Sequence, residues 1–167
     1  MFFLAFCKTN KTQYLLDGLK ILPPTNAHAD TEDRKVVIAE FIEEMSKLND
    51  VRWTDAFSGK KSAQVFTFER FSKWARINEL LTLADNENTI VRVYAFLCLK
   101  TRKNIDLKSI ALQHLQDTAY FTEVYGCIGN SKRINEYFFE ETIGYFSAAE
   151  IAKYRKAIAM LNSRCKY

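Results

Sequence analysis

The scarcity of helix breakers is the feature that most constrains how this chain can fold. Residues 60–125 contain neither glycine nor proline, and the 167 residues hold only five glycines and two prolines. Folds built entirely from β-strands need many tight turns, which depend on these two residue types. Long segments without them favour helices. With 48% hydrophobic residues, the chain can also bury a substantial core.

Apolar residues recur at three- and four-residue spacing in several segments, which predicts helices with one buried face. Asp30 to Asp33 supply a capping oxygen and acidic groups for one helix start, and Ser147 with Glu150 forms a capping box for another. Residues 50–64 show neither helical nor strand periodicity, so a long loop is predicted there. Helices are predicted at about residues 12–22, 30–49, 66–84, 90–101, 107–117, 119–128, 131–143 and 147–162.

One pair of these predicted helices carries a recognisable pattern. Ile77, Leu80, Leu81 and Leu83 are followed by a polar turn with Asp85, and then by Val91, Arg92, Ala95, Cys98 and Leu99. Residues 77–99 thus resemble a HEAT-type helical repeat, in which a turn aspartate precedes a Val-Arg step. A degenerate second unit spans 107–128, where Asp117 is kept but Phe121 and Thr122 replace the Val-Arg step. The spacing of about thirty residues is typical of a helical array.

The resemblance implies an all-α fold, a short stack of antiparallel helix pairs with flanking capping helices. We expect residues 30–167 to form this single all-helical HEAT-like domain. We expect residues 1–29 to form an N-terminal apolar segment with a weak helix and a Pro-Pro loop. Asp85, Val91, Arg92 and Asp117 are the structural signature of the repeat, and Arg92 is expected to pair with Asp85 or Asp117.

The predicted loop at 50–64 holds the preferred candidates for binding a partner. It combines aromatic and basic side chains, as many protein-binding hot spots and nucleic-acid stacking sites do. The alternative is that its tryptophan folds back onto the helical stack. The candidate residues are Arg52, Trp53, Phe57, Lys60 and Lys61.

Other polar residues suggest weaker alternatives. His114, Asp117 and Glu123 could form an acid/base or metal site, although a surface or capping histidine is more common. Cys127 lies between two glycines, where packing is the default and a nucleophile the alternative. Two groups of cations are expected to lie on solvent-exposed faces. If both groups lie on the same side of the stack, binding of an anionic partner is the alternative. They are Lys100, Arg102, Lys103 and Lys108, and Lys153, Arg155 and Lys156.

The N-terminus bears on location. Leu4, Ala5, Phe6 and Cys7 resemble a bacterial lipobox, although Phe6 stands where a small residue is expected. A lipid anchor at Cys7 and an envelope location are therefore the alternative to a cytoplasmic protein, if Met1 is a late start. No segment approaches the length of about 20 apolar residues that a membrane span needs.

These observations favour a non-enzymatic interaction module that binds a protein partner. This expectation includes no catalytic residues, no cofactor and no metal. A nucleic-acid-binding HEAT-like protein is the alternative that the resemblance implies, because some HEAT-like proteins bind nucleic acid through a basic concave face. The net charge of +4 permits weak attraction to anionic surfaces but does not require such a partner. A third hypothesis is a hydrolase-type enzyme that uses His114, Asp117 and Glu123.

Overall fold

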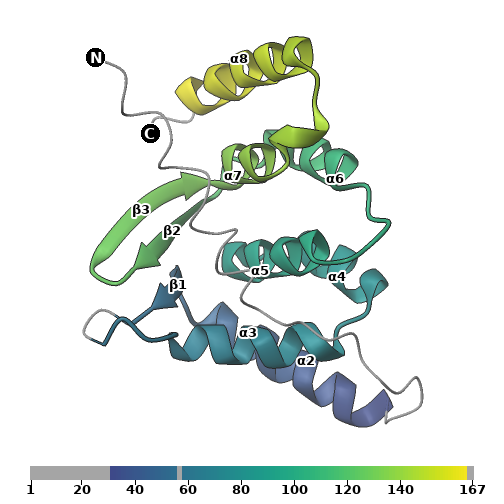
Figure 1. The fold of residues 1–167 in the computed structure, drawn as a ribbon, viewed down its shortest axis with the longest axis vertical. Coiled ribbons are helices and arrows are strands. Elements are labelled where there is room, and N and C mark those ends of the chain that lie inside the picture. Colours follow the sequence, from purple (N-terminus) through teal and green to yellow (C-terminus); the bar gives the residue numbers. More distant parts are fainter. Residues whose placement is uncertain (1–30, 56–57, 165–167) are drawn as a thin grey trace.

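The structure is a computed structural model, and it describes residues 31–55 and 58–164. The part of the chain that it describes contains helices, three strands and two short 3-10 turns (Figure 1). In chain order they are α2 (Thr31–Ser46), β1 (Asp50–Thr54), α3 (Ala63–Trp74), α4 (Ile77–Ala84), α5 (Thr89–Lys100), α6 (Leu107–Gln113), η1 (His114–Gln116), β2 (Tyr120–Tyr125), β3 (Ile128–Arg133), α7 (Ile134–Glu141), η2 (Ile143–Tyr145) and α8 (Ala148–Arg164).

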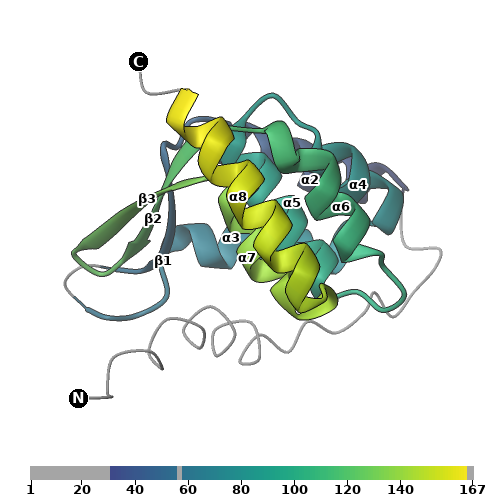
Figure 2. The ribbon, with the colours of Figure 1, turned by 90° about the horizontal axis from the view of Figure 1, so that it is seen from above.

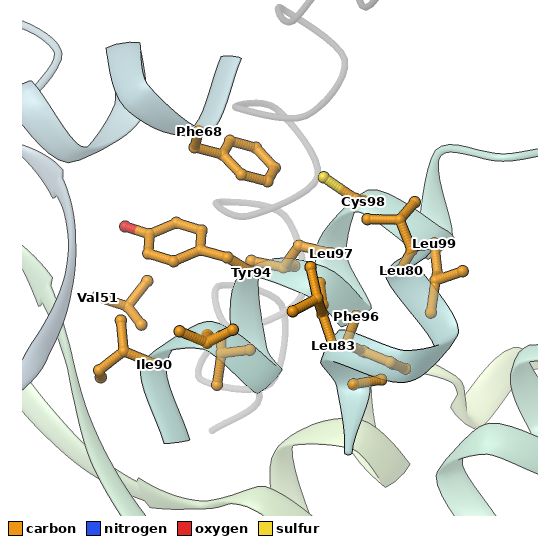
Figure 3. Packing of buried hydrophobic residues seen from close by; sticks show 14 of the residues in the cluster. Val51, Phe68, Leu80, Leu83, Ile90, Tyr94, Phe96, Leu97, Cys98 and Leu99 are labelled. Atoms are coloured by element: carbon orange, nitrogen blue, oxygen red, sulfur yellow. The ribbon is translucent and has the colours of Figure 1, made fainter. Parts of the chain in front are cut away.

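The helices are stacked in layers, with α2 and α3 at one end and α8 at the other (Figure 1). Helix α5 runs through the middle, and every residue from Ile90 to Leu99 is buried. Apart from Arg92 it is therefore largely apolar on all sides, as expected for a helix surrounded by others. The buried side chains of α5 meet those of α3, α4 and β1 (Figure 3).

Aromatic rings fill much of this core. Phe41 of α2 stacks on Phe71 of α3 with ring centroids 3.7 Å apart, and Phe96 of α5 stacks on Phe138 of α7 at 3.8 Å. The first pair joins the two helices at one end of the stack, and the second links α5 to the next layer at α7. A smaller apolar cluster attaches α8, in which Ile158 packs with Phe139 and Phe146.

The prediction of an all-α fold is wrong, because the chain also forms a three-stranded mixed sheet. Strand β2 lies in the middle, parallel to β1 and antiparallel to β3. Residues 50–54, predicted as loop, form β1, and residues 119–128, predicted as helix, contain β2. The sheet lies beside the helical stack, and the β2–β3 hairpin projects away from it (Figures 1 and 2).

The tight turn of the hairpin explains why this segment reverses instead of forming a helix. Only Gly126 and Cys127 separate the paired residues Tyr125 and Ile128. Gly126 has φ +59°, and Cys127 is not among the described residues with positive φ. This combination suits a type II′ turn, whose first central position favours glycine.

The predicted helix at 66–84 is two helices, and a distant arginine explains the break. Helix α3 ends at Trp74, and Ala75 adopts an extended conformation with ψ 129°. The guanidinium of Arg102 donates hydrogen bonds to the carbonyls of Ser72 and Ala75. It thereby satisfies carbonyl groups that a helix end leaves unpaired. No glycine or proline near Trp74 indicates this helix end in the sequence.

The other helices begin within a few residues of their predicted starts, with α7 confined to Ile134–Glu141 because β3 occupies the preceding residues. The predictions for the helix at 12–22, the domain segment 1–29 and the lipobox at Cys7 lie outside the described residues. None of the described helices is both long and apolar enough to cross a bilayer.

Candidate interaction surface

Trp53 lies inside the protein, although its loop was the preferred binding candidate. The indole is 1% exposed and packs edge-on against Phe68 and Tyr94. Because Val51 and Trp53 alternate with polar residues along β1, both point into the core. The geometry matches the alternative in which the tryptophan folds back onto the stack.

The remaining members of that group have different surroundings. Arg52 is partly exposed and pairs with Asp50 at 2.7 Å. Lys60 and Lys61 are exposed, and Lys61 pairs with a glutamate of α3. Phe57 lies outside the described residues. The structure therefore places two cations, but not the tryptophan, on the surface near β1.

Glu123 on β2 is the buried carboxylate that joins the sheet to its surroundings. Its side chain is 4% exposed and pairs with Lys132 of β3 at 2.6 Å. It accepts hydrogen bonds from the Trp53 indole N–H at 3.1 Å and from the Tyr125 hydroxyl at 3.2 Å. A buried charge is tolerated when it is paired and hydrogen-bonded in this way. Glu123 thus acts as a structural link among all three strands.

The residues of the repeat signature meet at the turn between α4 and α5. Arg92 Nε lies 3.1 Å from the Asp117 carboxylate, and its guanidinium donates to the carbonyls of Asn86 and Glu87 at 2.6 and 2.9 Å. Val91 is fully buried. This ion pair joins the α4–α5 turn to the segment that follows α6.

His114 extends this network between two aspartates. Its Nε2 is 3.3 Å from Asp85 and its Nδ1 is 3.6 Å from Asp117. Burial of the Asp117 carboxyl acts to raise its pKa. The contact with His114, the Ala119 backbone N–H and the charge of Arg92 outweigh that effect, so the pKa lies below its ordinary value. The network holds two turns together.

The hypothetical trio of His114, Asp117 and Glu123 is not assembled by these contacts. His114 and Asp117 lie near each other, whereas the partners of Glu123 are Trp53, Lys132 and Tyr125. Across residues 31–55 and 58–164, no group of three or more His, Cys, Asp or Glu side chains could hold a metal ion.

The two described cysteines differ in their surroundings. Cys98 lies in the centre of α5, where burial raises the pKa of its thiol far above the ordinary value and keeps it a neutral, inert core residue. Cys127 is exposed at the tip of the β2–β3 hairpin. The buried position of Cys98 differs from the partially exposed, electropositive setting that activates a thiolate.

Most cations of the first predicted group have partners within the chain. Lys100 and Lys108 each pair with a glutamate, on α7 and α8 respectively. Arg102 holds the end of α3, as described above. Only Lys103 of this group is exposed without an ion pair to a described residue. Internal pairing therefore accounts for this group better than a nucleic-acid surface does.

The outer edge of β3 is a candidate binding surface that was not predicted from the sequence. Strand β3 pairs with β2 along Ile128–Arg133, and no described strand pairs with its other side. Residues 128–131 are exposed, and the side chain of Ile128 is 65% exposed. The signal in the sequence was an aromatic and β-branched segment, residues 120–125, followed by a two-residue turn with glycine.

Comparison with protein-family models, with curated proteins and with solved structures gave no match. The HEAT-type resemblance stays a prediction that rests on the residue pattern and on the contacts of Arg92.

Proposed function

We propose that this protein is a non-enzymatic interaction module that binds an extended segment of a protein partner at the outer edge of β3. The single observation that supports it most is that no described strand pairs with the outer edge of β3, which belongs to a hairpin that projects from the helical stack (Figures 1 and 2). An edge strand presents a row of backbone donors and acceptors to which another strand can add.

The hydrogen-bond register identifies the groups that a partner would contact. In a two-residue hairpin the closing residues, here Tyr125 and Ile128, form a hydrogen-bonded pair, and such pairs alternate along the ladder. The Ile134 N–H donates to the Ala119 carbonyl at 3.0 Å, which fits the same alternation. The backbone groups of the exposed residues Gly129 and Ser131 therefore point away from β2 and toward a partner strand.

The opposite edge of the sheet supports this proposal by contrast. The Arg52 N–H on β1 donates to the Gln64 side chain at 2.8 Å, and the Arg52 carbonyl accepts from the Ser62 hydroxyl. The Tyr94 hydroxyl donates to the same Gln64 oxygen at 2.7 Å, which holds the Gln64 side chain against the edge of β1. The chain thus satisfies the outer edge of β1 internally. Blocking a sheet edge is a common protection against unwanted pairing, and β3 lacks such a block within the described residues.

A proline at the outward position tests the proposal directly. Ser131→Pro removes one outward N–H while leaving the residues that bond β2 unchanged, and prolines are tolerated on edge strands. Ser131→Ala is the matched control, since it removes the hydroxyl but keeps the N–H. Thermal unfolding of both variants verifies that the fold is intact.

Peptides selected from a random displayed library against the wild-type protein serve as the probe. We expect selected peptides to bind Ser131→Ala normally and Ser131→Pro up to about tenfold more weakly, which corresponds to the loss of one backbone hydrogen bond. Peptide addition should also slow amide exchange at Gly129 and Ser131. Selected peptides that bind the proline variant as tightly as wild type, or a selection that yields no binder, would refute strand addition at β3.

A further inference from the structure

Helix α8 is the last layer at one end of the stack, and only one side of it is covered (Figures 1 and 2). Its inner stripe consists of Ile151, Tyr154 and Ile158, which pack in the small apolar cluster with Phe139 and Phe146. Ile158 is the one buried residue of α8. The opposite side of a 17-residue helix therefore faces outward.

The exposed side of α8 carries one sign of charge. Glu150 is the helix's single acidic residue, and it is already bound by Lys108 at 2.7 Å and by the N–H of Ser147 at 2.9 Å. No acidic residue follows it through Arg164, whereas Lys153, Arg155, Lys156 and Arg164 all carry positive charge.

Three of these cations form a ridge with an apolar centre. Lys153, Lys156, Met160 and Arg164 follow one another at spacings of three, four and four, which places them on one helical face. All four are exposed, and Met160 is 49% exposed. Among the described residues, no carboxylate lies within ion-pair distance of Lys153, Lys156 or Arg164. Arg155 lies elsewhere on the helix, and its charge partly opposes the burial that raises the pKa of Glu140 on α7.

Small side chains border the ridge. Ala149, Ala152 and Ala159 are exposed on the same half of α8, so a second helix could approach its backbone closely. The surface therefore combines cations on its flanks, an apolar methionine between them and low side-chain bulk beside them.

We propose that this face of α8 binds an acidic amphipathic helix of a protein partner, with carboxylates opposite Lys153, Lys156 and Arg164 and an apolar side chain against Met160. Charge complementarity selects an acidic partner. The exposed methionine and the alanines favour a helix over a nucleic acid, because phosphates make no use of an apolar surface. The inference goes beyond strand addition at β3 and uses a separate surface.

Two probes separate this idea from simple charge attraction. The first is a fluorescently labelled, helix-stapled peptide of about 18 residues, or five turns, with glutamates around a leucine on one face. The second has the same composition in an order that spreads the glutamates around the helix. A DNA duplex of similar length is the competitor. Fluorescence anisotropy at several salt concentrations measures the affinities.

The variants are chosen so that net charge is matched. The triple variant Lys153→Glu, Lys156→Glu and Arg164→Glu reverses the ridge. The control replaces three exposed cations on other elements that have no ion pair to a described residue, namely Lys60→Glu, Lys73→Glu and Lys103→Glu. Met160→Ser tests the apolar contact without changing charge.

We expect the amphipathic peptide to bind wild type, the triple variant to weaken that binding at least about tenfold from three lost charge pairs, and the control to leave it unchanged. Met160→Ser should weaken binding several-fold. No binding at low salt, or equal binding of both peptides, would overturn the proposal. So would displacement by DNA with an unchanged Met160→Ser affinity, which would assign the face to nucleic acid. Ser131→Pro should bind the peptide normally, so failure here is distinguishable from failure at β3.

Discussion

Replacing Glu123 by alanine removes the acceptor that links β1, β2 and β3. The carboxylate is 4% exposed and has three partners. Without it, the indole N–H of Trp53 stays buried with no acceptor, since that residue is 1% exposed. A buried donor left unsatisfied costs about 1–3 kcal/mol. The ammonium of Lys132 loses its partner as well.

The loss of the ion pair adds a smaller amount. The side chain of Lys132 is 28% exposed, so its charge can turn toward water when Glu123 is absent. That contribution is therefore about 1 kcal/mol, well below the cost of stranding a fully buried charge. Together the two effects predict a decrease of about 3 kcal/mol in the free energy of unfolding. For a domain of this size the decrease corresponds to about 6–12 °C in Tm.

Urea unfolding followed by tryptophan fluorescence measures this change, because Trp53 reports on the site itself. Glu123→Gln keeps an acceptor for the indole but loses the charge opposite Lys132, so it should cost about half as much as alanine. Glu43→Ala removes an exposed helical ion pair with Lys47 and should leave stability unchanged.

Two results would refute this reasoning. The first is a Glu123→Ala protein as stable as Glu43→Ala, which would mean that the buried contacts are not maintained in solution. The second is an equal loss for glutamine and alanine, which would remove the indole hydrogen bond from the argument. A double-mutant cycle with Lys132→Ala isolates the ion pair, whose coupling should be about 1 kcal/mol.

Two further changes test the α4–α5 turn network and the hairpin. Asp117→Asn keeps an acceptor for the Ala119 N–H but removes the charge beside Arg92 and should cost about 2 kcal/mol at pH 7. Because the folded pKa of Asp117 is lowered, its stabilisation is complete above the unfolded value of about 4 and is lost as the pH falls through the lower folded value. The Tm difference from wild type should shrink below about pH 4, and a constant difference down to pH 3 would contradict this. Gly126→Ala should cost about 1–2 kcal/mol because an alanine at φ +59° is strained. Gly144→Ala, where φ is not positive and no atom lies within 4 Å of the added carbon, should be nearly neutral by thermal unfolding, and equal Tm values for the two would rule out backbone strain at the turn.

The helical part of the fold could be predicted largely from local pattern. Helix α5 has an asparagine cap at Asn88 and a continuous apolar segment, and both signals are local. Helix α8 begins at the capping box of Ser147 and Glu150, whose side chains form the expected hydrogen bonds. For such helices, propensity, caps and periodicity agree.

The sheet was not predicted from the sequence because a charged residue occupies an inward-facing position of β2. Phe121, Glu123 and Tyr125 share one face of β2, and Glu123 interrupts the apolar alternation that would indicate a strand. Phe121, Val124 and Tyr125 instead match helical spacing. The alternation of Val51 and Trp53 in β1 was present in the sequence, but five residues are too few to distinguish a strand from an irregular loop.

The candidate surfaces depended even more on tertiary structure. Trp53 has the chemistry of a binding residue, yet Glu123, seventy positions away, supplies the acceptor that permits its burial. The edge of β3 becomes a candidate only because Gln64 and Ser62 close the opposite edge, which no local pattern reveals.

The sequence by itself determined where most helices lie, because turns of helix are stabilised by residues three and four positions apart. Glycine at position 126 is also required locally, because a side chain at φ +59° is strained, but the helix predicted at 119–128 shows that the turn itself was not evident from the sequence. The tertiary structure decided which residues are buried, where α3 ends and which cations remain unpaired. Those outcomes rest on contacts such as Arg102 with Ser72 and Lys100 with Glu141, whose partners are far apart in the chain and meet only when the layers stack.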